Sequence, residues 1–373
     1  MPAPPIYFDH HATTPCDPRV VEAMLPYFTE TFGNPASLTH EHGRKAASAL
    51  EDARIFISRF FGAQPNEIIF TAGATESNNI TLHLVHGGAH LITSAVEHRS
   101  ILAPAKRVAD VTILQPDREG FIDPDALRAA IKANTRLVSI EAANGEIGTL
   151  QNINALAQIV HERGVLFHSD VTQAAGKIAL DFSKLDLASF SAHKFYGPKG
   201  IGGLYVRRGV RVEPLIVGGG QEKNLRSGTV NVPGAIGMAK ALQLRAIEMD
   251  EEAQRLTQMR NELWDRLLAE IDGVSINGPR ALRLPGNLNV SFERVEADSL
   301  MVAMRRFSLS SGSACSSGQR GPSAVLTAIG VREPAALGSI RVGLGKSNTP
   351  EHIAMFVDDA KRIVAKLREI SAA

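Results

Sequence analysis

Cysteine is almost absent from this 373-residue chain, which has only Cys16 and Cys315. The two are far apart in unlike surroundings, so they form neither a disulfide framework nor the paired spacing of a zinc site. Such sparse cysteine use is typical of a reducing compartment, and we expect a cytoplasmic protein. Whether either thiol takes part in chemistry is a separate question.

Long hydrophobic runs and an excess of charge of one sign are also missing. No apolar stretch approaches the roughly 18 residues that a membrane span requires. The proline-rich start, residues 1–5, has neither the basic region nor the apolar core of a secretory signal. The formal net charge is +1, so no strong field favours nucleic acid or an anionic membrane. We therefore expect a protein that binds neither nucleic acid nor membranes.

What the chain does have is an ordinary globular composition, with 44% hydrophobic and 21% charged residues, and enough length for two packed domains. Through much of its length, short apolar runs alternate with amphipathic stretches. This alternation predicts an α/β fold with a mostly parallel sheet and helices on both faces. The expected strands are 68–70, 91–93, 111–114, 137–140, 165–167 and 187–190, with 202–206 as an antiparallel addition.

A long helical pattern, from about 232 to 271, should lead into a smaller C-terminal domain of mixed strands and helices. One segment there, residues 310–322, is almost entirely small and polar. It cannot bury enough apolar surface to order itself firmly, and a loop of ~12 residues can carry Cys315 over ~10 Å or more. The other expected elements are a strand at 287–292, a helix at 298–306, a strand at 339–342 and a last helix that begins near 350.

Lys194 stands at the end of a buried strand rather than on a helix face. The apolar run 187–190 precedes it, and Gly197-Pro198 breaks regular structure soon after. Ser191 and His193 flank it with a hydroxyl and an imidazole. A lysine in this setting can form a Schiff base with a carbonyl cofactor whose phosphate its neighbours hold. The alternative is a solvated surface lysine, which most lysines are.

Polar stretches fall at the expected carboxyl ends of four strands, where ligands bind in open α/β sheets. They are 72–76, 96–98, 168–173 and 191–194. Together they offer a glycine turn at a helix start, a flat imidazole, a carboxylate and a lysine. Pyridoxal 5'-phosphate uses all four, for its phosphate, its ring face, its ring nitrogen and its aldehyde. Each residue alone also has a structural explanation, such as a helix cap or an ion pair.

Ten stretches, in order along the chain, resemble a cysteine desulfurase of the type that supplies sulfur for iron–sulfur cluster assembly. These enzymes belong to the class V aminotransferases, within the fold-type I pyridoxal-phosphate enzymes. The resemblance runs from residue 6 to about 345. The matching stretches are 12–15, 32–37, 73–77, 97–98, 146–148, 170–173, 191–200, 226–229, 311–315 and 340–341.

The resemblance implies a domain organisation and partners. A large cofactor-binding domain, residues 16–250, would contain a mostly parallel sheet of the seven-stranded type covered by helices. A smaller α+β domain would combine residues 1–15 with 251–373 and carry the mobile loop of Cys315. The enzyme would be a homodimer that uses L-cysteine and passes sulfur to an acceptor or an iron–sulfur scaffold protein.

The resemblance also implies which residues bind the cofactor. Lys194 would hold it covalently, and Asp170 would pair with the ring nitrogen. Gln173 would bond the ring hydroxyl oxygen, and His98 would stack on the ring. The remaining implied cofactor contacts, mainly to the phosphate, are Ala74, Thr75, Ser191, His193 and, from the other subunit, Thr229.

The substrate and the chemistry receive residues in the same way. Asn34 and Arg341 would hold the substrate carboxylate, for which an arginine fork is well suited. Lys194 would take the Cα proton, His98 would carry protons, and the Cys315 thiolate would attack the substrate sulfur. Cys16 has no counterpart role, and we expect it to be structural.

Two departures from the family leave questions open. His10-His11 stand where the family has an aromatic and a small residue, and Gly145 stands where it usually has a second asparagine that meets the cofactor. The sequence does not say whether Asn144 replaces that contact. Alternative functions also remain: a selenocysteine lyase, a small-amino-acid aminotransferase, or a scaffold that mainly binds assembly partners. A cysteine on a mobile loop favours the desulfurase over the aminotransferase.

Overall fold

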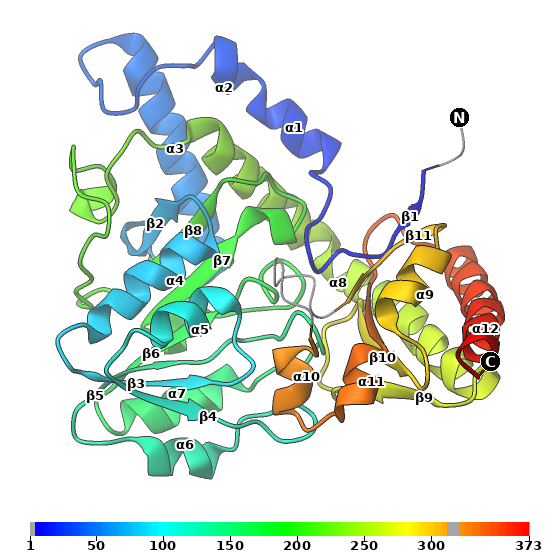
Figure 1. Ribbon diagram of the computed structural model, residues 1–373. Coiled ribbons are helices and arrows are strands. Elements are labelled where there is room, and N and C mark those ends of the chain that lie inside the picture. Colours follow the sequence, from blue (N-terminus) through cyan, green and yellow to red (C-terminus); the bar gives the residue numbers. More distant parts are fainter. Residues whose placement is uncertain (1–3, 312–320, 373) are drawn as a thin grey trace.

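A seven-stranded sheet is the largest unit of the computed structural model, which describes residues 4–311 and 321–372 (Figure 1). Its strands are β2 (Ile68–Thr71), β3 (His90–Ser94), β4 (Asp110–Leu114), β5 (Thr135–Ser139), β6 (Leu166–Asp170), β7 (Leu187–Ser191) and β8 (Gly202–Val206). They lie in the order β2-β8-β7-β6-β5-β3-β4. Every pairing is parallel except those of β8, which is antiparallel to β2 and β7. The expected mostly parallel sheet is confirmed.

Helices cover both faces of this sheet. Successive side chains on a strand point to opposite faces, and both faces carry apolar side chains. On β2, Ile69 packs into a cluster with Ile80 and Ile101, which belong to α4 (Ala74–Leu82) and α5 (Arg99–Ala105). The next residue, Phe70, belongs instead to the larger core on the opposite face. The helices of that core are α3 (Glu41–Phe60), α6 (Pro124–Ala130), α7 (Ile153–His161) and the first part of α8 (Val232–Glu270).

A second hydrophobic core forms around a four-stranded antiparallel sheet in the order β12-β13-β10-β9. The end of α8 packs against it. The other elements of this half are β9 (Val274–Asn277), β10 (Asn287–Phe292), α9 (Ala297–Ala303), β11 (Phe307–Ser308), β12 (Ser310–Ser311), α10 (Ala324–Ala328), α11 (Glu333–Leu337), β13 (Ser339–Gly343) and α12 (Pro350–Ala372). Within the two described ranges, no helix is both long and apolar enough to cross a bilayer.

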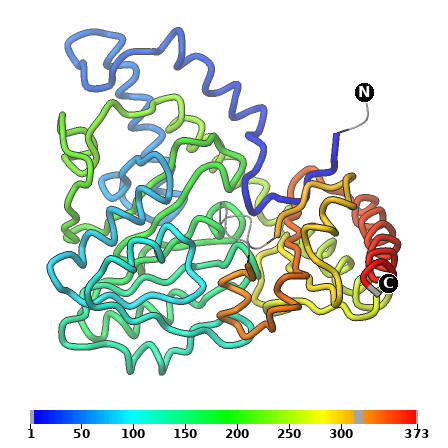
Figure 2. The backbone as a smooth tube through the Cα atoms, in the orientation of Figure 1, coloured from blue at the N-terminus to red at the C-terminus, as the bar shows by residue number. Residues whose placement is uncertain are grey.

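The N-terminal segment joins the two cores. It starts as β1 (Ile6–Tyr7), which pairs in parallel with β11, and Phe8 is buried in the second core. It then passes to the large sheet, where the backbone N–H of Thr14 donates to the carbonyl oxygen of His193 at 2.9 Å. Figure 2 shows this segment in dark blue, running from the small sheet towards the helices that follow, α1 (Pro18–Met24) and α2 (Pro26–Thr29).

Candidate functional site

A cleft of about 1740 Å³ opens at the carboxyl ends of the parallel strands, where the two cores meet. Nine of the predicted site residues line it: Ala74, Thr75, His98, Asp170, Gln173, Ser191, His193, Lys194 and Arg341. Asn34 and Thr229 are exposed and are not among the lining residues. Cys315 lies outside the described residues. The structure therefore brings together most, but not all, of the side chains that the sequence singles out.

Lys194 reaches the cleft from a tight turn. Strand β7 ends at Ser191, and residues 192–194 form a single 3-10 turn. Gly197 closes the turn by donating its N–H to the carbonyl oxygen of Ala192, and any Cβ at Gly197 would lie only 2.8 Å from that oxygen. The Lys194 amine donates to the carbonyl oxygens of His11 and Ala12, each at 2.8 Å. The N-terminal segment thus fixes the direction of the lysine.

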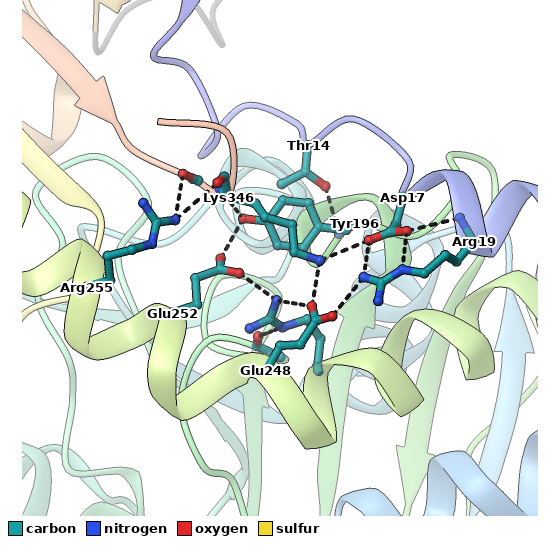
Figure 3. Close-up of polar contacts among 11 residues, drawn as sticks. Thr14, Asp17, Arg19, Tyr196, Glu248, Glu252, Arg255 and Lys346 are labelled. Carbon is teal, nitrogen blue, oxygen red and sulfur yellow. Dashed lines mark hydrogen bonds and ion pairs between the residues drawn. The ribbon is translucent and has the colours of Figure 1, made fainter. Parts of the chain in front are cut away.

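Tyr196 clamps the loop just after Lys194, and its backbone φ of 67° lies in the left-handed region that few non-glycine residues adopt. Its hydroxyl donates to Glu252 at 2.6 Å and accepts the backbone N–H of Lys346 at 2.9 Å. The Lys346 ammonium in turn pairs with Asp17 at 2.9 Å. Figure 3 shows Tyr196 at the centre of these contacts, between α8, the N-terminal segment and the chain after β13. The loop is therefore tied to three separate elements.

Asp170 ends strand β6 and lies at the cleft with only 6% of its surface exposed. Its carboxylate accepts the side-chain N–H of Asn78 at 2.7 Å and the backbone N–H of Thr172 at 3.0 Å. A carboxylate can accept more than two hydrogen bonds, so it can also accept one from a ligand. Behind it, His168 is held between two serine hydroxyls, and burial lowers the pKa of His168 to about 4.

His98 is the N-cap of α5, and its role as a cap fixes its tautomer. Its Nδ1 accepts the backbone N–H of Ser100 at 3.1 Å, so in the neutral ring the proton is on Nε2. Enclosure by the cleft walls lowers the pKa of His98, and the charges of Lys194 and Arg99 lower it further, while Asp170 opposes them. His98 is therefore neutral at pH 7, with one N–H to give and a flat ring.

The N-terminal turn of α4 forms an anion site beside Lys194. The first N–H groups of a helix have no intrahelical acceptor, and here those of Ala74 and Thr75 belong to residues that line the cleft. The one acid of this turn, Glu76, is neutralised by Arg226 at 2.9 Å and by the N–H of Ala72 at 2.7 Å. Ser191 approaches the same turn, since a Cβ at residue 73 would lie 3.5 Å from its hydroxyl.

Asn144 does not replace the cofactor contact that Gly145 lacks. Its two side-chain N–H groups donate to Val96 at 3.0 Å and to Glu141 at 2.7 Å. Its oxygen accepts the backbone N–H groups of Glu146 and Ile147, at 2.9 and 2.8 Å. All the hydrogen-bonding capacity of the amide is thereby used inside the protein. The open question from the sequence is answered: Asn144 shapes its loop.

Arg341 reaches the cleft from β13 but is already paired. One N–H of its guanidinium donates to Asp9 at 2.7 Å, and a second to the carbonyl oxygen of Gly145 at 3.3 Å. Its buried Nε has no partner within the described part of the chain. Asn34 instead uses its side-chain oxygen to accept the N–H of Ala36 at 3.0 Å. Arg341 is therefore oriented by contacts within the chain, and Asn34 stabilises its own turn.

Sequence reasoning missed two groups at this site. One is a pair of buried carboxyls, Glu97 and Glu141, which both line the cleft. Burial raises the pKa of each, and the charge of Glu97 raises that of Glu141 further. The position of Glu141, just past the end of β5, could have indicated from the sequence that it belongs to the site. The other group is His11 and Lys177, which both contact Gln173. His11 was noted only as a departure from the family, and Lys177 was not singled out.

The sequence is similar to those of known proteins over nearly the whole chain. The sequence model of the family described as Aminotransferase class-V matches residues 6–356. A protein described as Cysteine desulfurase IscS, from Anaeromyxobacter dehalogenans (strain 2CP-C), is 47% identical over 98% of this chain and 94% of its own length. Its counterpart from Dictyoglomus turgidum (strain DSM 6724 / Z-1310), with the same description, is 46% identical over 98% of this chain and 96% of its own.

Solved structures agree with the sequence matches. A structure described as a NifS-like protein superposes with a TM-score of 0.90 at 36% identity, covering 97% of this chain and all of the other (100%). Another, described as SspA in complex with cysteine, gives a TM-score of 0.81 at 35% identity over 91% of this chain and 98% of its own. With a family match over nearly its whole length and close relatives of one description, the chain belongs to the class V aminotransferases and, among them, to the cysteine desulfurases.

Proposed function

We propose that this enzyme uses pyridoxal 5'-phosphate to convert L-cysteine into L-alanine and retains the sulfur as a persulfide on Cys315. The observation that supports this most directly is the convergence of Lys194, Asp170 and His98 on one cleft, beside the N-terminal turn of α4. The class V family is pyridoxal-phosphate dependent. The sulfur chemistry is proposed from the desulfurase relatives and from the presence of Cys315 in the sequence between β12 and α10.

The residues present fit this cofactor. Its aldehyde would meet the Lys194 amine, whose direction is set by two carbonyl oxygens, and its phosphate would meet the first N–H groups of α4. Its ring nitrogen would meet the buried carboxylate of Asp170, which can accept a further hydrogen bond. The neutral imidazole of His98 offers a flat ring face. When bound, the cofactor supplies an electron sink for negative charge that develops at the substrate Cα.

The side chains of the chain then have distinct tasks. Lys194, once its amine is free, takes the Cα proton, and the carbonyl oxygens of His11 and Ala12 keep it oriented. His98 gives and takes protons through Nε2, because Nδ1 is used in capping α5. Asp170 keeps the ring nitrogen protonated. The substrate carboxylate binds at Arg341, which lines the cleft and whose guanidinium also contacts Asp9 and the carbonyl oxygen of Gly145.

The described residues on either side of the Cys315 segment are near the proposed substrate site. Ser310 and Ser311 pair with Arg341 and Ile340 of β13, and Gly321 lines the cleft. In the proposed reaction the Cys315 thiolate attacks the substrate sulfur. A new S–S bond forms as the Cβ–S bond breaks, and the electron pair of the broken bond remains with the carbon skeleton of alanine.

The decisive experiment follows the sulfur. After one turnover with L-cysteine and no reductant, a mass spectrum should show one extra sulfur on the peptide that contains Cys315. Cys315→Ser should remain yellow and bind L-cysteine, yet release alanine more slowly by orders of magnitude, since a hydroxyl is a poor nucleophile towards sulfur. Cys16→Ser is the matched control and should behave like the parent. Undiminished alanine release by Cys315→Ser would favour a lyase or aminotransferase instead.

We also propose the assembly and the division into domains. The two hydrophobic cores support a large domain of residues 16–250 and a small domain of residues 1–15 and 251–373. A band of exposed apolar side chains lies on and near α1 and α2, as expected of a surface that a second subunit covers. Its members are Val21, Leu25, Phe28, Phe32 and Leu38. In such a homodimer, Thr229 contacts the phosphate in the partner's cleft, because it is exposed and away from its own cleft. Asn34 completes the substrate site. The persulfide sulfur then passes to an acceptor such as an iron–sulfur scaffold protein.

A further inference from the structure

A second lysine lies directly behind the cleft. Lys177, which is half-buried, follows the turn after β6 and lines a small inner cavity of about 20 Å³ together with His10, His11 and Glu252. Nothing in the proposed reaction uses it. A lysine is rarely enclosed unless its ammonium group has a specific partner, so its contacts call for an explanation.

The partner of Lys177 is the side chain of Gln173. The Lys177 ammonium donates to the side-chain oxygen of Gln173 at 3.0 Å. An ammonium group has only donors, so the atom of Gln173 that faces it must be the oxygen and not the nitrogen. The amide is then fixed with its NH2 group on the other side, where it donates to the carbonyl oxygen of His11 at 2.9 Å. Lys177 thus settles an orientation that an amide alone leaves open.

The ring of His11 obeys the same constraint. Its Nδ1 lies 3.2 Å from the Gln173 oxygen, which can only accept, so Nδ1 carries the proton. Burial and the nearby charges of Lys177 and Arg341 lower the pKa of His11 and keep the ring neutral. The oxygen of Gln173 is therefore held by two donors, one from Lys177 and one from His11.

The carbonyl group of His11 connects the pair of Lys177 and Gln173 to Lys194 in the cleft. The carbonyl oxygen of His11 accepts from the Gln173 NH2 group at 2.9 Å and from the Lys194 amine at 2.8 Å. The NH2 group of Gln173 also borders Gly145, because a Cβ there would lie only 2.6 Å from the nitrogen. Since Gly145 has no side chain, nothing of it covers the amide on that side, and both residues line the cleft with Lys194.

We propose that Lys177 is a positioning residue for the cofactor: it holds the Gln173 amide so that the NH2 group, and not the oxygen, is presented to the cleft beside Lys194. The inference rests on the proposed function, because the second N–H of Gln173 would then donate to an oxygen on the ring of bound pyridoxal phosphate. Without Lys177 the amide can turn over and place its own oxygen against that ring oxygen, which is repulsive.

The charges around Lys177 explain why its ammonium group depends on Gln173. Lys194 and Arg341 on the cleft side and Arg245 on α8 repel it, and Glu252 on α8 attracts it. Together with burial, these cations lower the pKa of Lys177 to about 7. A specific acceptor stabilises the protonated form of such a lysine, and the nearest acceptor is the Gln173 oxygen at 3.0 Å. His11 Nδ1 is farther away, at 3.5 Å, and carries its own proton.

The test is a double-mutant cycle on cofactor affinity. Apoprotein of the parent, Lys177→Met, Gln173→Ala and the double variant is titrated with pyridoxal phosphate, and the dissociation constant and the visible absorbance maximum are recorded. Each single substitution should weaken binding roughly threefold to tenfold, the effect of one hydrogen bond. If Lys177 acts through Gln173, the double variant should bind no more weakly than Gln173→Ala and should share its absorbance maximum.

Two further variants make the result independent of folding and of general effects. Lys177→Gln keeps a polar side chain, but one that can accept as well as donate hydrogen bonds. It should therefore weaken pyridoxal-phosphate binding when Gln173 is present and have no effect in the Gln173→Ala background. It serves if Lys177→Met does not fold. Lys132→Met removes an exposed lysine that pairs with Asp110 far from the cleft, and it should leave affinity and spectrum unchanged.

Two results would overturn the inference. One is parental affinity and spectrum in the Lys177 variants. The other is a double variant weakened by the product of the single effects, which would mean that Lys177 acts independently of Gln173. Neither result would contradict the proposed function, which is tested separately with Lys194→Ala. If Lys194→Ala retained the borohydride-reducible link to the cofactor, the proposed function itself would fail.

Discussion

At the scale of single residues, the space at Gly145 controls the neighbouring amide. Gly145 does not have a left-handed backbone, so Gly145→Ala carries no backbone strain, but its Cβ would lie 2.6 Å from the nitrogen of Gln173. We expect the flexible end of Gln173 to shift and pyridoxal-phosphate affinity to fall roughly threefold to tenfold. Titration of the apoprotein measures this. In the Gln173→Ala background the same substitution has room and should change little; an equal loss there would contradict the argument.

A second prediction at this scale concerns acid stability. Burial lowers the pKa of His168 to about 4 in the folded protein, against 6.5 in the unfolded chain. The unfolded state therefore binds the extra proton between these values, and the stability associated with His168 is present above pH 6.5 and lost as pH falls towards 4. Relative to His168→Gln, the parent should lose about 2 kcal/mol more between pH 6.5 and 4.5. Urea unfolding of the apoproteins at both pH values measures it, and parallel losses would refute it.

How far the sequence predicts single site residues depends on their neighbours in the chain. Lys194, Asp170 and His98 were predictable because each lies at the carboxyl end of a strand or within four residues of it, and parallel strands bring their carboxyl ends together. The role of His11 was not predictable, because it arises from contacts with residues more than 160 positions away. Lys177 lies only four residues after Gln173, but nothing in the sequence distinguishes it from a surface lysine. Asn34, predicted from resemblance, caps its own turn in the single chain.

At the scale of elements, length decided what the sequence could reveal. Strands of the large sheet were predicted because each has four or five residues with clear flanking breaks. The short strands β11 and β12, with two residues each, were not, since so few residues show no period. Helix α9 ends at Ala303, three residues before the expected end at 306, because the backbone of Met304 leaves the helical region.

The clamp on the Lys194 loop gives a prediction for this scale. Tyr196→Phe keeps the ring but removes the hydroxyl that joins Glu252 to the backbone of Lys346. One of these bonds involves the half-buried carboxylate of Glu252, so we expect the free energy of unfolding to fall by roughly 1–3 kcal/mol. Urea denaturation of the apoprotein is the measurement. Unchanged stability would mean that the N–H of Lys346 and the carboxylate of Glu252 find other partners.

At the scale of the whole molecule, the proposed dimer can be tested by complementation. Lys194→Ala and Thr229→Ala should each be impaired, the second because it weakens the partner's phosphate site. Unfolding and refolding the two together gives heterodimers in half of the random pairs, each with one intact site, so activity should reach about a quarter of the parent's. Activity no higher than the sum of the separate variants would mean that the sites are not shared.

The route of the N-terminal segment has a consequence for biosynthesis. Residues 6–12 hold Lys194 in place, yet β1 pairs with β11, and Asp9 is anchored by Arg341 of β13. During synthesis, residues 6–12 therefore cannot dock until β11 and β13, near the other end of the chain, have been made. Nascent chains stalled before residue 339 should fail to trap pyridoxal phosphate on treatment with borohydride, whereas released full-length chains should trap it. Cofactor acquisition would then serve the cell as a signal that translation of this protein has been completed.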